Sequence, residues 1–147
     1  MIDPRLEHFL LYELDDDWMP LGPFVGTVRQ IDPKNCSTQR VAAIIEEFIR
    51  NQWMIPGSWS TETGTWEPWH VTVEEAMARI AEGYEGEAGY IGADEEELAT
   101  TEVFRGEITE VGRRRLDDLG SPYEKYGDPW ESNPSLRATG DFPPWTP

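Results

Sequence analysis

Apolar residues recur at helical spacing near the start of the chain. Residues 5–14 carry one apolar stripe with the i, i+3, i+4 spacing of an amphipathic helix. The stripe consists of Leu6, Phe9, Leu10 and either Glu13 or Leu14. Three adjacent carboxylates follow at residues 15–17, where mutual repulsion and the helix dipole disfavour a further turn. We therefore expect the first helix to end at these aspartates.

Two further helices are predicted before residue 54. The first covers residues 21–31, with Pro20 or Pro23 placed in its first turn. The second covers residues 38–53 behind a Ser37 or Thr38 cap, and its pattern is the clearest in the chain. Its apolar stripe is Val41, Ile44, Ile45, Phe48 and Ile49, and its polar face includes Gln39, Arg40, Glu46, Glu47 and Arg50.

The middle of the chain predicts an aromatic connection followed by a fourth helix. Residues 57–70 are rich in Gly, Ser, Thr and Trp, which indicates an irregular segment or a hairpin whose tryptophans pack on the domain. Thr72 and Glu75 have the spacing of a capping box. A helix is therefore expected from residue 72 to about residue 83 or 86.

An acidic stretch lies between residues 82 and 102 and is interrupted by glycines. It has no Lys or Arg and is expected to form a solvated acidic loop. Residues 101–108 then alternate as a strand. Thr109 is expected to cap a terminal helix over residues 110–119.

The composition changes after Gly120, where six prolines occur within 27 residues. Proline at this density prevents a continuous helix or strand, so residues 121–147 are expected to form an extended tail rich in Pro and Trp. The pattern as a whole predicts one α+β domain over residues 1–120. It is mainly α, a bundle of four to five helices with a small β-hairpin or wing.

Two stretches of this pattern resemble the winged-helix domains of bacterial regulators. Residues 10–26 look like the first helix, polar turn and second helix of such domains, and residues 106–116 look like the Thr-x-x-Gly-Arg passage after the wing strand. The chain also resembles a loose group of small actinobacterial proteins without assigned function, in which Glu-Pro-Trp (residues 67–69) precedes a Glu-Glu-Ala helix start (residues 74–76). The resemblance implies a degenerate winged-helix-like domain.

Cysteine and histidine usage bounds the chemistry. Cys36 is the single cysteine, and with only His8 and His70 it offers no zinc-type ligand set, so neither a metal nor a cofactor is expected. The sequence contains no nucleotide-binding glycine motif and no Ser-His spacing typical of a nucleophile. The start of the chain lacks a signal-peptide pattern, and no run reaches about 18 apolar residues. We therefore expect a cytoplasmic protein that is not an enzyme.

The charge favours a basic partner. Twelve Lys and Arg against 29 Asp and Glu give a net charge of −17, which repels nucleic acid and attracts basic surfaces. The first hypothesis is a noncatalytic protein-interaction module, such as an inhibitor or an immunity-type protein, that binds a basic protein. A purely solubilising role for the acidity is the plainer reading. The residues proposed to bind the partner are Asp94, Glu95, Glu96, Glu97, Glu102, Trp66 and Trp69.

The alternative hypothesis is a winged-helix transcription regulator that binds DNA. In such proteins the third helix enters the major groove. Here that helix carries two arginines against Glu46 and Glu47, and the region of the wing is acidic. The residues available for DNA are Arg40, Arg50, Arg113 and Arg114, with Arg115 beside them, and their gathering on one face would favour this alternative.

Overall fold

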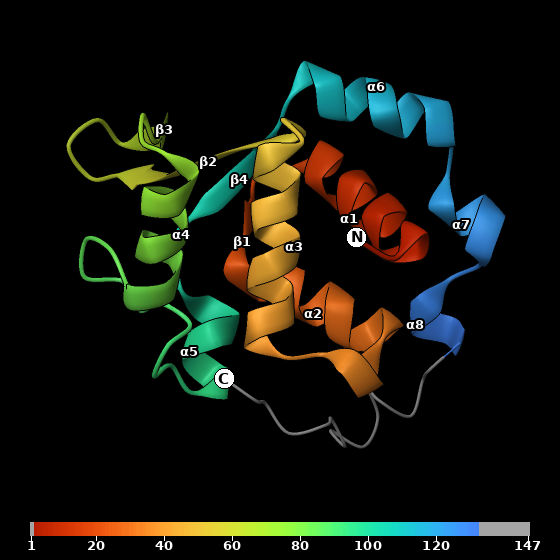
Figure 1. Ribbon diagram of the computed structural model, residues 1–147, viewed down its shortest axis with the longest axis horizontal. Helices are drawn as coiled ribbons and strands as arrows, with labels where there is room; N and C mark the ends of the chain where they lie inside the picture. Colours follow the sequence, from red (N-terminus) through yellow and green to blue (C-terminus); the bar gives the residue numbers. More distant parts are fainter. Residues whose placement is uncertain (1, 133–147) are drawn as a thin grey trace.

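Helices surround one side of a small sheet in the computed structural model, which describes residues 2–132 (Figure 1). The prediction of an α+β fold that is mainly α is confirmed. In chain order, the elements are α1 (Pro4–Asp16), β1 (Met19–Pro20), α2 (Leu21–Ile31), the 3₁₀ turn η1 (Pro33–Asn35), α3 (Thr38–Arg50), β2 (Met54–Ser60), β3 (Thr65–Pro68), α4 (Val73–Glu82), α5 (Glu95–Thr100), β4 (Arg105–Ile108), α6 (Glu110–Leu119), α7 (Pro122–Tyr126) and α8 (Pro129–Ser132).

The sheet is antiparallel, with the strand order β1-β4-β2-β3. Side chains alternate across its two faces, because successive residues of a strand point in opposite directions. Met54 and its register partner Ile108 are buried on the face that meets the helices, whereas Ile55 and Trp59 are exposed on the other face. The sheet therefore has an inner face toward the core and an outer face toward solvent.

Aromatic rings join the helices to the sheet inside the core. Phe24 of α2 stacks on Phe104, which precedes β4, with ring centroids 5.9 Å apart. The same Phe24 meets Phe48 of α3 edge to face at 6.4 Å. All three rings are fully buried, so each contributes the favourable transfer of a large apolar side chain from water.

The predicted helix starts are confirmed at three caps. The hydroxyl oxygens of Ser37, Thr72 and Thr109 accept backbone N–H bonds of 3.1, 3.1 and 2.9 Å in the first turns of α3, α4 and α6. The first helix runs further than predicted, since it includes Asp15 and Asp16 and ends before Asp17. The third helix ends earlier than predicted, at Arg50.

The strand predicted over residues 101–108 is shortened to β4, which begins at Arg105. Two backbone amides just before β4 bond to side chains and not to a strand. The Val103 N–H donates to the Thr101 hydroxyl oxygen at 3.2 Å, and the Glu102 N–H donates to a Glu87 carboxylate oxygen at 2.9 Å. The Thr101 hydroxyl in turn donates to the Ala88 carbonyl. Residues 101–104 therefore do not join the β2 ladder.

Part of the stretch predicted as an acidic loop over residues 82–102 is helical. Asp94 accepts the Glu97 N–H at 2.8 Å, and the Glu97 side chain accepts the Asp94 N–H, so the two residues form a capping box at the start of α5. Leu98 of this helix is buried. The acidic run thus begins a helix that packs against α2.

The prediction of an extended tail is wrong for residues 121–132, which form α7 and α8 against the first two helices, each beginning at a proline, where the missing N–H costs little. Tyr123 meets Phe9 edge to face at 5.2 Å, and the Gln30 side-chain amide donates to the Pro129 carbonyl at 2.9 Å. The remainder of the predicted Pro-rich tail, residues 133–147, lies outside the described residues.

Candidate functional site

A cleft of about 900 Å³ lies where the β2–β3 hairpin meets the segments around α4. In Figure 1 the hairpin and α4 are neighbours on the side of the molecule away from α7. Three parts of the chain line the cleft: the hairpin with the residues that follow it (58–62 and 67–71), the end of α4 with its following loop (79, 84, 85 and 87), and residues 102, 103 and 105 just before and at the start of β4. The shortened β4 leaves this space open.

The aromatic wall of the cleft is built around Arg79 of α4. Its guanidinium carbon lies 4.1 Å from the ring centroid of Tyr84 and 5.1 Å from that of Trp69. The Trp69 indole N–H donates to the Ser58 hydroxyl at 2.9 Å, which orients the ring from the hairpin side. Trp69 and Tyr84 also meet edge to face at 5.4 Å. These contacts hold the two rings in fixed positions, as expected of a preorganised binding wall.

Five glutamates and two arginines are among the residues that line the cleft, so its formal charge is negative by three. The glutamates are Glu62, Glu67, Glu85, Glu87 and Glu102, and the arginines are Arg79 and Arg105. Both cations are already paired, since Arg105 binds Glu102 with two bonds of 2.6 and 2.8 Å and Arg79 lies 3.6 Å from Glu75. The hydrogen bonds that Arg105 donates to Glu102 are the main cause that raises the pKa of Arg105.

Three rim carboxylates remain available to a ligand. Within residues 2–132, the side chains of Glu62, Glu67 and Glu85 make no ion pair and accept no hydrogen bond. All three residues are exposed. They come from the hairpin loop, from β3 and from the loop after α4, so they converge on the cleft only in the fold.

The acidic residues chosen from the sequence divide between two places. Glu102 lies in the cleft, whereas Asp94 and Glu97 form the capping box of α5. Glu95 pairs with Arg29 at 2.9 Å, and Glu96 is exposed on the same helix. Within the described chain, no residue of 94–97 lines the cleft.

The two tryptophans chosen from the sequence lie on opposite faces of the hairpin. Trp69 faces the cleft, while Trp66 lies across Gly57 on the outer face and donates its indole N–H to the Arg105 carbonyl at 3.0 Å. Trp66 also stacks on Trp18, with centroids 5.9 Å apart and an interplanar angle of 17°. The Trp66 ring therefore connects β3, β2 and β4, so these contacts stabilise the sheet.

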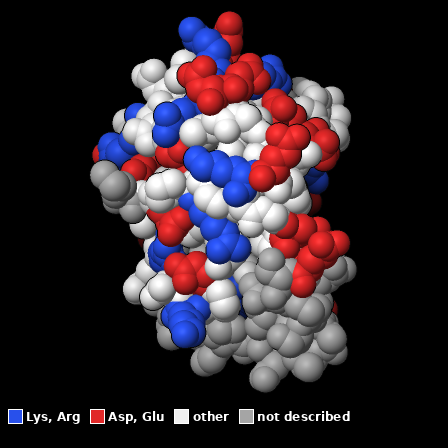
Figure 2. Space-filling view, turned by 90° about the vertical axis from the view of Figure 1, so that its right-hand side faces the viewer, with Lys and Arg blue, Asp and Glu red and all other residues white. Residues whose placement is uncertain are grey.

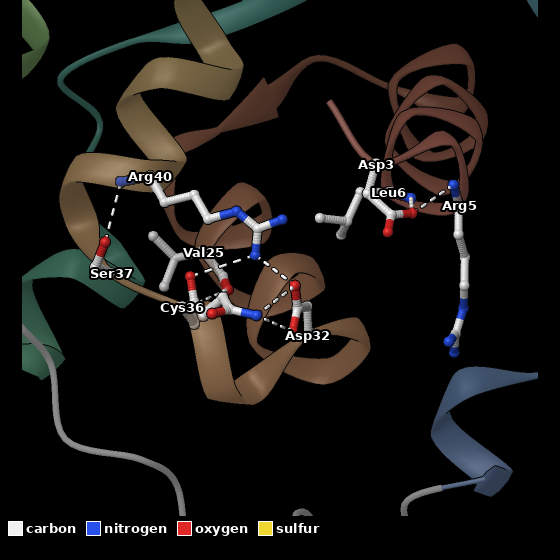
Figure 3. Close-up of polar contacts among 9 residues, drawn as sticks. Asp3, Arg5, Leu6, Val25, Asp32, Cys36, Ser37 and Arg40 are labelled. Carbon is white, nitrogen blue, oxygen red and sulfur yellow. Dashed lines mark hydrogen bonds and ion pairs between the residues drawn. The ribbon is translucent and has the colours of Figure 1, made fainter. Parts of the chain in front are cut away.

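The arginines proposed for DNA are held by carboxylates from different elements. Arg40 binds Asp32 at 2.6 Å, as Figure 3 shows, and Arg113 binds Asp15 at 3.2 Å. Arg50 binds both Glu46 and Glu74 at 3.0 and 2.9 Å. On the side of the molecule shown in Figure 2, Lys and Arg are interspersed with Asp and Glu.

The two remaining members of the basic run lie on α6. Arg114 is exposed on this helix. Arg115 binds Glu7 of α1 at 3.0 Å and lies 5.9 Å from the Trp53 ring centroid.

A second hollow of about 430 Å³ lies beside Arg40 and is lined by residues 34–37 and Arg40. Its thiol, Cys36, is buried, and burial raises the pKa of that thiol to about 11. A neutral thiol is a poor nucleophile. Among residues 2–132, no group of three or more His, Cys, Asp or Glu side chains is placed to hold a metal ion.

The sequence analysis missed Arg79, Tyr84, Glu62, Glu67 and Glu85 as members of one site. The strand register was the missing information, because it alone sets which hairpin residues face α4.

No protein-family model, no curated protein and no solved structure matches the chain. Within the described part of the chain, no helix is long and apolar enough to cross a membrane.

Proposed function

We propose that this chain is a noncatalytic protein-interaction module that holds a basic protein partner in the cleft beside the hairpin. The observation that carries the proposal is that carboxylates without an ion-pair partner lie at the rim of the cleft beside a fixed aromatic wall. Glu62, Glu67 and Glu85 would accept charge-assisted hydrogen bonds from Lys or Arg side chains. Trp69 and Tyr84 would cover the aliphatic parts of the same side chains.

The net charge of −17 supports the same proposal through association kinetics. A strong negative field steers a basic partner toward the molecule and raises the association rate, with an effect that falls as salt screens it. An inhibitor or immunity-type protein that occupies the basic surface of its target is the specific form of this function. We place this activity in the cytoplasm, where a lone buried thiol stays reduced.

A degenerate winged-helix scaffold remains part of the proposal. Its support is the order of elements: α1, β1, α2 and α3 precede β2, and β4 leads through the Thr109 cap into α6. The hairpin strand β3, α4 and α5 lie between β2 and β4. Most of the residues that line the cleft belong to this intervening segment and none belongs to α3, so the proposed binding site is distinct from a DNA-reading α3.

DNA binding is less well supported than protein binding. Phosphate contacts would require Arg40, Arg50 and Arg113 to leave their carboxylate partners. Each exchange gives up an existing ion pair, and the surrounding carboxylates would still repel the duplex. Protein binding requires no such exchange, because the rim carboxylates in the cleft are unpaired.

Affinity purification from native cells at low and moderate salt tests the proposal, with proteins identified by mass spectrometry and nucleic acid quantified in the same eluate. The wild-type chain should retain a discrete basic protein that is released as salt rises. The cleft variant Glu62→Gln, Glu67→Gln, Glu85→Gln should lose it. Co-purification of DNA in place of a basic protein would overturn the proposal in favour of the regulator.

A matched control distinguishes an effect of the cleft carboxylates from an effect of the total negative charge. The variant Glu110→Gln, Asp117→Asn, Asp118→Asn removes the same three charges from exposed positions of α6, outside the cleft. It should retain the partner as well as the wild type does. Equal loss of the partner in both variants would show that only total acidity matters and would contradict a cleft-based function.

A further inference from the structure

Strand β2 extends beyond its neighbour β4 at the edge of the cleft. β2 runs from Met54 to Ser60, but β4 pairs with it only as far as Gly57, opposite Arg105. Within residues 2–132, no strand continues this ladder along residues 58–60 on the side of β4. The cleft lies against this uncovered length of β2, since residues 58–60 line it together with residues 102, 103 and 105.

Two hydrogen bonds fix which way the backbone of β2 points. The Thr109 N–H donates to the Trp53 carbonyl at 2.9 Å on the β4 side, and the Trp69 N–H donates to the Pro56 carbonyl at 2.9 Å on the β3 side. Because such bonds alternate along an antiparallel strand, odd-numbered residues of β2 point toward β4 and even-numbered ones toward β3. The N–H and C=O of Trp59 therefore point into the cleft, where β4 has already ended.

The chain is prevented from covering this edge itself. If β4 continued, residue 103 would lie opposite Trp59, but its amide is bonded to the Thr101 hydroxyl. The neighbouring Glu102 amide is bonded to Glu87. These local bonds hold residues 101–104 away from β2, so the uncovered edge belongs to the folded structure.

The outer edge of the sheet is less suitable for pairing. By the same alternation, Trp66 and Pro68 are the residues of β3 whose backbone groups point outward. Pro68 has no N–H to donate, and proline on an edge strand discourages further pairing. The cleft edge of β2 combines a complete donor and acceptor pair at Trp59 with the surrounding carboxylates.

We propose that the basic partner inserts an extended segment into the cleft as an additional strand on β2, pairing with the backbone of Trp59. This inference rests on the proposed function and adds the mode of recognition. In β-strand addition, backbone bonds hold the peptide and alternate side chains enter the site. Lys or Arg side chains of one alternating set would meet Glu62, Glu67, Glu85 and the Trp69 ring, which fits the negative charge of the cleft.

The first test measures amide exchange by NMR on the full chain, with acetyl-Lys-Val-Lys-Val-Lys-Val-Lys-amide as the probe. Saturating peptide should slow hydrogen exchange of the Trp59 amide by about tenfold or more, as a new backbone bond requires. The amide of Trp66, which points to the opposite edge, is the internal control and should not change. Binding that leaves the Trp59 amide unprotected would overturn the inference.

The second test replaces each peptide amide in turn by its N-methyl form. Strand pairing predicts a period of two: N-methylation at amides that face β2 should weaken binding by about tenfold, and methylation at the intervening residues should have little effect. A flat profile from a peptide that still needs the three rim glutamates would overturn strand addition and leave the proposed function standing. A peptide that binds the wild type no better than the cleft variant would overturn both.

Discussion

Replacing Gly112 by alanine tests whether close backbone approach determines how α6 begins. A Cβ at this position would lie 2.5 Å from the Trp53 carbonyl oxygen and 2.9 Å from Cγ1 of Ile108. The same Trp53 carbonyl accepts the Thr109 N–H, which anchors the start of α6 to the segment after α3. Relief of the contact therefore requires α6 to move away from its own anchor.

The sign of the effect follows from two opposing contributions. Alanine in place of glycine in a helix stabilises by about 1 kcal/mol, because glycine loses more backbone entropy on folding. Overpacking against backbone costs about 1–3 kcal/mol, and weakening the Thr109–Trp53 bond costs about 1 kcal/mol more. We therefore expect Gly112→Ala to lower the free energy of unfolding by about 2 kcal/mol.

Urea unfolding followed by far-UV circular dichroism measures this change, with a second helical glycine as the matched control. A Cβ at Gly26 of α2 has nothing within 4 Å, so Gly26→Ala should raise the free energy of unfolding by about 1 kcal/mol. At Gly22 of the same helix the Cβ would lie 2.6 Å from the Ala99 carbonyl oxygen, so Gly22→Ala should destabilise like Gly112→Ala. If Gly112→Ala proved as stable as Gly26→Ala, close approach would not explain this glycine.

Three shorter predictions concern other residues. The buried Cys36 thiol should react slowly with a thiol reagent at pH 7.5 and fully in denaturant, and prompt labelling of the native protein would contradict its raised pKa. Burial alone would raise the pKa of Asp32, but the hydrogen bonds from Arg40 and Asn35 outweigh it and lower that pKa. This carboxylate therefore stabilises the fold above its unfolded pKa, and the stability lost in Arg40→Met at pH 7 should shrink as the pH falls below about 4 in parallel urea titrations. Thr109→Val should cost about 1 kcal/mol in the same assay through loss of the α6 cap, whereas Thr109→Ser should cost less.

The elements that sequence reasoning placed well are those set by local interactions. The start of α4 at Thr72 and that of α6 at Thr109 depend on a side chain bonding to an amide three residues later, a distance that the sequence shows directly. The apolar stripe of α3 has the same local character. Strand β4 was misplaced at its start because Thr101 bonds to Ala88, thirteen residues earlier in the chain, and no period-two pattern reveals that contact.

The hairpin shows what a sequence pattern contains once the register is known. Trp69 comes three positions after Trp66, an odd interval, so regular strand alternation sends the two side chains to opposite faces. One ring then bridges the outer face of the sheet, and the other forms the wall of the cleft. The odd spacing of the two tryptophans is visible in the sequence. The assignment of this segment to a strand, which is needed to interpret that spacing, is not.

The acidic residues form two groups, one brought together by the sequence and the other by the fold. Asp94 and Glu97 are close in sequence, and the side chain of each accepts a hydrogen bond from the backbone amide of the other at the start of α5. Glu62, Glu67 and Glu85 come from separate segments, and within the described residues they bond to no other group, although each gathering of like charges costs stability. Acidic residues that serve a helix cap are explained by the fold itself. The convergence of unpaired carboxylates on one aromatic cleft has no such internal explanation, so we propose the cleft, and not the acidic run, as the binding site.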